Sequence, residues 1–395
     1  MEIRNSRTAT LRDWELARLT SFSFRVLTFA FLFAGGCGAP GEPTPPSPPI
    51  PAAVTDLSAQ QAGDGVQLTF TLPANTVAGD RLTSPPAVEF VRGTSKPDGS
   101  PNLKSFRVVY TIPGSLVDNY ASKGHLKFID PIAPEETLAH PGSSLVYVVR
   151  TRASKKRASP DSNTVSVRMF PVPEAIARLE AHVSESAIDL SWTAPTRTSG
   201  GGPLSALTGY RIYRGELDPS SAEAASTDFS KAKWKSPLTL LAPSDETSYH
   251  DTLFDFGKTY AYVVRSVVLV EGNALESSDS VSVIVAARDT FPPAAPQNLV
   301  AAAVLSGAPA GSVLVDLSWS INLETDLAGY RVYRSERQDT RGVLITPDLL
   351  LTPAYRDTSV EPGHRYWYSV TAVDRAGNES DPSASVAVDV AKPSS

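Results

Sequence analysis

The chain has 395 residues, which is enough for two to four domains. Its 36 Lys and Arg residues stand against 42 Asp and Glu residues, and the net charge of −6 argues against nucleic-acid binding. Cys37 is the only cysteine, so each domain must be stabilised by its own apolar core instead of a disulfide. The 33 prolines and the scarcity of long amphipathic stretches favour an all-β fold.

Residues 1–36 have the order of a bacterial signal sequence. Basic Arg18 and Arg25 precede a short apolar run at 26–34, and small residues stand immediately before Cys37. The run is too short to span a bilayer, which needs about 20 residues, but it suits a signal-peptide core. The pattern resembles a lipoprotein signal, which implies that Cys37 is acylated and becomes the new N-terminus. The alternatives are an ordinary cleaved secretory signal and an uncleaved anchor.

Residues 37–53 form a proline-rich tether, which we expect to be extended at about 3.1 Å per residue. Gly38 and Ala39 follow the cysteine, where an Asp often marks inner-membrane retention in lipoprotein families. The resemblance therefore favours the outer membrane. It implies a lipid-anchored, extracytoplasmic protein of the cell envelope. No later segment approaches 18 consecutive apolar residues, so no other membrane span is predicted.

The rest of the chain repeats one pattern. A turn followed by an alternating strand occurs three times, at 140–150, 255–267 and 361–373. Two upstream segments also match between the second and third copies, namely 188–192 with 315–319 and 209–214 with 329–334. In a strand, this alternation places the apolar residues on one face. The pattern predicts three copies of one β-module.

These segments resemble fibronectin type III modules: a strand that ends in Trp192 or Trp319, a tyrosine-rich strand, and then Pro-Gly-x-x-Tyr-x-Tyr-x-Val. The resemblance implies a seven-stranded sandwich of two sheets in each copy. It also places Tyr260 and Tyr366 at the tyrosine corner, where the hydroxyl bonds to nearby backbone. The predicted fold class is therefore all-β, with three tandem immunoglobulin-like β-sandwiches. The predicted domains are 54–170, 173–288 and 294–391.

The first copy is the divergent one. Phe70 takes the place of the core tryptophan, and Leu145 takes the place of the corner tyrosine. We align 105–110 with the third strand of the other copies, which leaves 73–102 as a large inserted loop. The proline-rich joints between copies are predicted to be short, semi-rigid hinges, so the copies should form a rod.

The sequence carries no enzyme signature. It contains no His-Glu-x-x-His, no Gly-x-Ser-x-Gly, no phosphate-binding glycine loop and no dinucleotide fingerprint, and its five histidines lack metal-ligand spacing. We therefore predict a protein that is not an enzyme and has no cofactor or metal. Four acids lie at turns and joints: Asp255, Asp289, Asp374 and Asp381. Turn formation is favoured for them over a calcium ion held between modules.

Lys155, Lys156 and Arg157 are predicted in the loop between the last two strands of the first copy. Loops of this kind often carry binding function, and three cations would favour a polysaccharide or a lipid head group. The alternative is a charged loop tip that only keeps the protein soluble.

Tryptophans supply two further features. In the last copy, Trp367, Ser369 and Thr371 are predicted to face outward. An outward Trp367 could stack on a sugar or anchor a protein, while the alternative is packing against Arg331 or Tyr355. Trp234 is interpreted as a hydrophobic plug under the loop of the second copy.

The predicted function is a lipid-anchored rod that acts as a protein-interaction module or structural spacer of the cell envelope. The alternative is a carbohydrate-binding accessory or an adhesin-like surface protein. The expected partners are the membrane, through the anchor, and an unknown envelope protein or polysaccharide.

Overall fold

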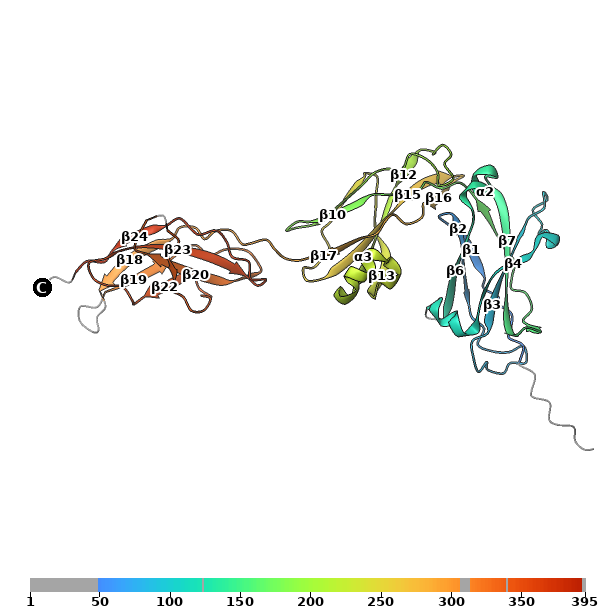
Figure 1. The fold of residues 1–395 in the computed structure, drawn as a ribbon, viewed down its shortest axis with the longest axis horizontal. Helices are drawn as coiled ribbons and strands as arrows, with labels where there is room; N and C mark the ends of the chain where they lie inside the picture. The colour runs from blue at the N-terminus through green and yellow to red at the C-terminus, as the bar shows by residue number, and fades with distance from the viewer. Residues whose placement is uncertain (1–48, 123, 306–312, 339, 393–395) are drawn as a thin grey trace, which may run out of the picture.

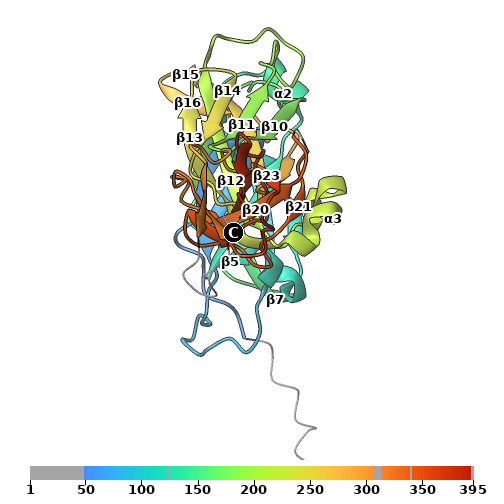
Figure 2. The same cartoon turned by 90° about the vertical axis from the view of Figure 1, so that its left-hand side faces the viewer.

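The computed structural model describes residues 49–122, 124–305, 313–338 and 340–392, so the predicted signal and Cys37 lie outside the described residues. Three sandwiches follow one another along the long axis (Figure 1). A view along that axis shows them one behind another (Figure 2). Within the described ranges, no helix has the length and apolar character needed to cross a membrane.

The first sandwich packs two antiparallel sheets around one core. One sheet has the order β1-β2-β6-β5, with β1 Ser58–Ala62, β2 Gly65–Thr71, β6 His125–Pro131 and β5 Ala121–Ser122. The other has the order β4-β3-β7-β8, with β4 Arg107–Ile112, β3 Ala87–Thr94, β7 Ser143–Ser154 and β8 Arg157–Ala158, and β9 Val165–Met169 also pairs with β7. The 3₁₀ turns η1 Leu103–Ser105 and η2 Gly114–Asn119 and the helix α2 Pro134–Ala139 connect strands. Alternation in β6 buries Leu126, Phe128 and Asp130 and exposes their neighbours.

The second sandwich repeats this arrangement. Its smaller sheet has the order β10-β11-β14, with β10 Leu179–Val183, β11 Ile188–Trp192 and β14 Ser248–Asp251. Its larger sheet has the order β13-β12-β15-β16, with β13 Trp234–Ser244, β12 Leu207–Leu217, β15 Thr259–Val270 and β16 Asn273–Glu276, and β17 Val283–Ala286 pairs with β15. Short turns η3 Pro219–Ser221 and η4 Phe229–Lys231 flank the helix α3 Ala222–Thr227.

The third sandwich has sheets β18-β19-β22 and β21-β20-β23-β24. Their bounds are β18 Val300–Leu305, β19 Val313–Ser318, β22 Ala354–Asp357, β21 Val343–Leu344, β20 Leu327–Ser335, β23 Arg365–Asp374 and β24 Val386–Asp389. Its core holds Trp319 edge-to-face on Tyr330 at 5.2 Å between ring centroids, as Trp192 lies on Tyr210 in the second sandwich. These aromatic pairs join the two sheets of each sandwich.

The predicted fold class is confirmed: the chain folds into tandem immunoglobulin-like β-sandwiches. Both predicted tyrosine corners are present. The hydroxyl of Tyr260 accepts the backbone N–H of Asp255 at 3.0 Å, and that of Tyr366 accepts the N–H of Glu361 at 3.1 Å. Each bond fixes the turn that leads into the long central strand.

The stretch 73–102 is not a single inserted loop, because it contains β3. Val88 and Phe90 of β3 enter the core, and the strand pairs with β4 and β7. The segment that we aligned with the third strand is β4, which lies one place further out, at the sheet edge. Its aromatic-Arg-Val sequence imitates the third strand of the other copies, but the edge position leaves Val108 and Tyr110 exposed.

The outward face predicted for alternate residues of β23 is correct, because the residues between them form the core, but two of the three outward residues are covered. Ser369 is 8 % exposed and Thr371 is fully buried. Polar side chains of the same sheet cover this face, and Thr371 donates to Glu379 at 2.8 Å. A polar residue on the outer face of a sheet can thus be buried by its neighbours' long side chains.

Candidate functional site

The predicted cationic loop lies at the end of the β7–β8 hairpin. Lys155 and Lys156 form the exposed turn between the strands, and Arg157 is half-buried at the start of β8. The guanidinium of Arg152 donates to the carbonyl of Lys155 at 3.0 Å, which fixes the turn. An anionic partner for these residues stays a prediction.

Trp367 is half-buried on β23, and its packing partner differs from those expected. The guanidinium of Arg365 lies 6.0 Å from the centre of the indole, where Arg331 or Tyr355 was expected. Arg365 is in turn held by Asp389, with nitrogen–oxygen distances of 2.6 and 2.5 Å. A binding role for Trp367 stays a prediction.

Trp234 is 37 % exposed, so the loop under which a hydrophobic plug was expected covers it only in part. Its ring contacts Phe229 edge-to-face at 5.4 Å, and it lies directly over Gly215. A Cβ atom at Gly215 would come within 2.5 Å of the indole, so only glycine permits this packing. The glycine therefore positions the tryptophan beside the small second core around Leu217.

A buried constellation recurs in all three sandwiches and was not predicted. An arginine from the third strand and a tyrosine from the long central strand both bond to one aspartate. The members are Arg92, Asp130 and Tyr147; Arg214, Asp251 and Tyr262; and Arg334, Asp357 and Tyr368. In chain order, the Arg–Asp distances are 2.8, 2.6 and 2.8 Å, and the Tyr–Asp distances are 2.8, 2.7 and 2.9 Å. We call each set an Arg-Asp-Tyr triad.

The Arg-Asp-Tyr triads are structural. Burial, together with the neighbouring aspartate, raises the pKa of Tyr147, Tyr262 and Tyr368 well above the usual range, so the phenols stay protonated as donors. The aspartates are at most 4 % exposed, which keeps them from external ligands. The triad therefore pins the central strand of one sheet to the end of the facing sheet.

We expect the third sandwich to lose stability in acid through Asp357. Burial acts to raise the pKa of Asp357, but hydrogen bonds from Ser359, Tyr368 and Arg334 outweigh it and hold that pKa below its ordinary value of 3.8. The folded state thus favours the carboxylate more than the unfolded chain does, so this stabilisation is complete above about pH 5 and is lost as the pH falls through the folded-state pKa. Urea unfolding followed by hydrogen exchange in β23 should show the loss. Asp357→Asn should reduce the acid dependence of that region, and an unchanged dependence would contradict the assignment.

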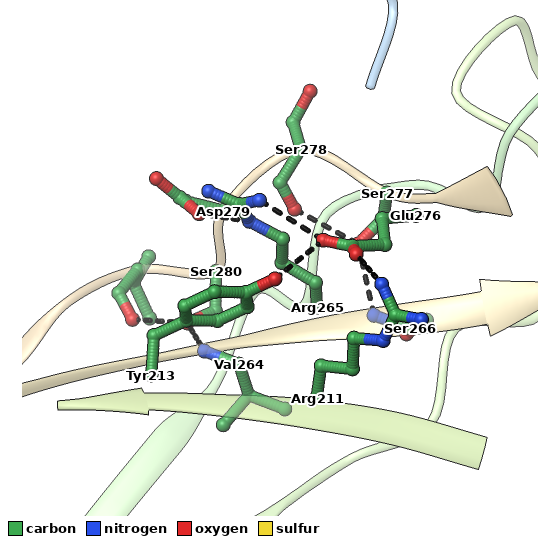
Figure 3. Close-up of polar contacts among 11 residues, drawn as sticks. Arg211, Tyr213, Val264, Arg265, Ser266, Glu276, Ser277, Ser278, Asp279 and Ser280 are labelled. Carbon is green, nitrogen blue, oxygen red and sulfur yellow. Dashed lines mark hydrogen bonds and ion pairs between the residues drawn. The ribbon is translucent and has the colours of Figure 1, made fainter. Parts of the chain in front are cut away.

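A second polar cluster covers the outer face of the larger sheet in the second sandwich (Figure 3). Glu276 on β16 accepts from Arg265 at 2.9 Å, from the hydroxyl of Tyr213 at 2.8 Å, and from Arg211. The guanidinium of Arg265 also lies 4.4 Å from the centre of the Tyr213 ring and bonds to Asp279 at 2.5 Å. The cluster joins β12, β15, β16 and the following loop.

The third sandwich repeats this cluster around Glu379. Arg331 donates at 2.6 Å and Tyr333 at 2.7 Å, and Arg341 bonds to the same carboxylate. Burial would raise the pKa of Glu276 and Glu379, but their hydrogen-bond donors lower both. A general base needs a pKa near the working pH, so these carboxylates are poorly suited to proton transfer. The clusters fit a role in holding strands together.

Paired serines fasten the segment before the last strand of each sandwich to the long central strand. The hydroxyls of Ser277 and Ser280 accept the backbone N–H groups of Ser266 and Val264, each at 3.0 Å (Figure 3). The corresponding pairs are Ser159 with Ser162 and Ser380 with Ser383. These bonds satisfy N–H groups of the central strand where no neighbouring strand does so.

The joint between the first and second sandwiches is a packed contact. The glycine loop at 200–202 lies on α2. A Cβ atom at Gly200 would come within 2.8 Å of the carbonyl oxygen of Pro134 and 3.2 Å of the Leu138 Cβ. The hydroxyl of Ser199 donates to Asp64, and burial raises the pKa of that carboxyl.

A second set of contacts widens this joint. Arg168 of β9 forms a bidentate ion pair with Glu271 in the turn between β15 and β16. Val172 in the linker is fully buried. A cleft of about 330 Å³ remains beside the joint and is lined by charged residues that include Lys127 and Asp279. Polar bonds on both sides of a buried linker fix the direction of the two sandwiches relative to each other.

The joint between the second and third sandwiches brings three acids together. Carboxylate oxygens of Asp289, Asp326 and Asp374 lie within 4.8 Å of one another, so these residues could together hold a divalent cation. Two of them already serve turns: Asp374 accepts from the backbone and side chain of Asn378, each at 2.8 Å, and Asp289 accepts from the N–H of Phe291. These bonds agree with the turn-forming role expected for Asp289 and Asp374.

Comparison with known proteins gives partial likenesses. No model of a known protein family matches the chain. It is similar to Exoglucanase B of Cellulomonas fimi, with 27 % identity over 260 residues, which cover 64 % of this chain and 20 % of that protein. It is also similar to Amylopullulanase of Thermoanaerobacterium saccharolyticum, with 37 % identity over 95 residues, which cover 24 % of this chain and 7 % of that protein. The chain thus spans a fifth or less of each of these relatives.

Among solved structures, the FN1–FN3 domains of chicken CNTN1 align with 87 % of the chain at 12 % identity and a TM-score of 0.26. The fold itself follows from the strand order and from the tyrosine corners described above.

The sequence contained signals for the Arg-Asp-Tyr triads. Asp251 and Asp357 are each the last residue of a strand and are each followed by a threonine, and Asp130 is the last but one residue of β6 in the first copy. The repeated Arg214 and Arg334 are the last residues of the matched segments 209–214 and 329–334. Aligning these acids with the repeated arginines would have indicated the pairing and would have identified Arg92, and therefore β3, in the first copy.

Proposed function

We propose that the protein is a non-catalytic, lipid-anchored spacer of the cell envelope that holds a bound protein partner at a set distance and direction from the membrane. Cys37 would carry the anchor, and the three sandwiches would form the extracytoplasmic rod. The packed joint between the first two sandwiches carries this proposal, because a spacer must keep a fixed direction under load. The enclosure of Glu276 and Glu379 by their donors also supports a non-catalytic role.

The anchor is tested by incorporation of labelled palmitate into the full-length protein and into Cys37→Ser. We expect label in the membrane fraction for the wild type and none for the variant. Equal labelling of both proteins, or release of the unlabelled wild type into the medium, would reject the anchor and leave the rod without its attachment. Crosslinking in whole cells, followed by capture of the full-length protein, then tests for an envelope partner.

Gly200→Val is expected to open the joint between the first two sandwiches, because its side chain would collide with Pro134 and Leu138 of α2. Gly201→Asn is the matched control, since Gly201 has a φ of +80° that asparagine tolerates and nothing lies within 4 Å of its Cβ position. Small-angle X-ray scattering of the protein without its signal should show a changed distance distribution for Gly200→Val alone. Identical curves for both variants and the wild type would show that the joint does not set the direction.

A second candidate function is a carbohydrate-binding accessory. The similarity to proteins named Exoglucanase B and Amylopullulanase favours this function. The chain matches only a small part of each of them, as an accessory domain would. Retention of the protein on insoluble cellulose or starch, with albumin as the control, tests this function. Absence from both pellets would reject it without affecting the spacer function.

A further inference from the structure

A column of aromatic rings in the first sandwich runs from the core to the surface. Phe90 is fully buried, Phe128 is 8 % exposed and Tyr110 is 43 % exposed. Phe90 and Phe128 stack with 4.2 Å between ring centroids, and Phe128 and Tyr110 stack with 4.9 Å and only 18° between ring planes. One face of Tyr110 is thus packed against the core, and its exposed area lies on the remaining side.

The position of Tyr110 in the fold explains this arrangement. It lies on β4, directly opposite Phe90 of β3, and β4 is an edge strand. The register therefore points the ring toward the core, while the edge leaves its outer side uncovered. A ring fixed in this way has already lost its rotamer freedom, so a ligand that stacks on it does not have to order it.

A second tyrosine extends the surface. Tyr120, at the end of η2, has its ring centroid 6.4 Å from that of Phe128. The neighbouring Tyr110 side chain raises the pKa of the Tyr120 phenol, so the two phenols lie near each other. Next to Tyr120 is an open hollow of about 560 Å³. Its lining residues are Asn119, Tyr120, Ala121, Lys127, Phe128 and Ile129.

We propose that this surface is a glycan-binding site, in which Tyr110 and Tyr120 stack on pyranose rings and Asn119 and Lys127 bond to the hydroxyls. The proposal rests on the second candidate function above, carbohydrate binding, and locates the binding site on the first sandwich. A pyranose presents C–H groups on its face and hydroxyls at its edge. It therefore matches a rigid aromatic ring with a polar rim, here formed by two phenols and by the exposed Asn119 and Lys127. The bound chain would be a gluco-oligosaccharide that runs along the edge formed by β4 and η2.

The test is calorimetric titration of the protein lacking its signal with maltohexaose and with cellohexaose, which separates α-linked from β-linked glucans. We expect one of them to bind, and Tyr110→Ala to weaken that binding by about tenfold or more, since the stacked face is lost. Tyr110→Phe keeps the ring and should bind within about threefold of the wild type. Val108→Ala, on the same strand and 49 % exposed, is the matched control and should bind normally.

The outcomes separate the site from the function. If the wild type binds neither glucan, the accessory function and this site both fail. A second outcome is that the wild type and Tyr110→Ala bind a glucan equally well while Trp367→Ala does not bind it. In that case the accessory function stands and this site is rejected. Circular dichroism of Tyr110→Ala must show a folded protein, and Tyr120→Ala provides the second variant if it does not. Binding of a protein, but no glucan, that depends on Tyr110 would reject the glycan and identify a protein-docking surface.

Discussion

Asp357→Ala is expected to unfold the third sandwich under conditions in which the other two remain folded. The substitution leaves Arg334 without the carboxylate that it bonds at 2.8 Å, and it leaves the buried Tyr368 hydroxyl without its acceptor. Removing one partner of a buried ion pair costs about 3–5 kcal/mol of unfolding free energy. That is a large share of the roughly 5–15 kcal/mol that stabilises a typical domain. Hydrogen exchange should show β20 and β23 losing protection while β12 and β15 keep theirs.

Asp316→Ala provides the control, because it removes an ion pair of the same kind at the surface. Asp316 bonds Arg356 at 2.6 Å, but the two side chains are 40 % and 61 % exposed. Exposed pairs contribute about 0–1 kcal/mol, so this variant should unfold close to the wild type. If Asp357→Ala and Asp316→Ala were equally stable, the buried triad would not be a main support of the sandwich.

Trp319→Ala is expected to destabilise the third sandwich by about 3–5 kcal/mol, because it removes a core ring and leaves a cavity. Trp319 is 6 % exposed and packs edge-to-face on Tyr330 between the two sheets. Differential scanning calorimetry should show one transition moving to lower temperature, by about 4–8 °C for each kcal/mol in a domain of this size. Since the three cores are separate clusters, the other transitions should not move.

Trp367→Ala gives the matched control, as it removes the same side chain from the same sandwich. Trp367 is half-buried under Arg365 and contributes no atoms to the core cluster. We expect a loss of less than about 1.5 kcal/mol, in the range of ordinary surface changes. The reciprocal variant, Trp192→Ala, should lower the transition of the second sandwich alone. A shift of every transition together in either core variant would show that the sandwiches unfold as one unit.

Local alternation and internal repetition were sufficient to predict most of the fold. Trp192, Trp319 and the corner residues Tyr260 and Tyr366 occupy the positions expected from the repeat. The first copy was harder, because β3 has no tyrosine and follows a stretch rich in turn residues, while β4 carries a similar sequence at the edge. Pairing in a sheet depends on partners far along the chain, and alternation alone does not tell a central strand from an edge strand.

The contacts at the candidate sites were less accessible to sequence reasoning. Nothing local to Gly200 indicates that it lies on α2, since the contact is made only when two folded sandwiches meet. Tyr110 was assigned to a central strand, so its exposed stacking face was missed. The burial of Thr371 depends on Glu379 and its arginines, which come from other elements of the sheet. These features follow from tertiary packing instead of from the period of the strands.

The two joints have different mechanical consequences. The first is closed by Ser199 and Asp64, by the ion pair of Arg168 with Glu271, and by the glycine loop on α2. The second is a short run with three prolines, held mainly by bonds from Asn378 to Asp289 and by Phe256 against Phe291. Tension applied to the C-terminal end should therefore reorient the third sandwich first. The first and second sandwiches should then move together as one rigid body.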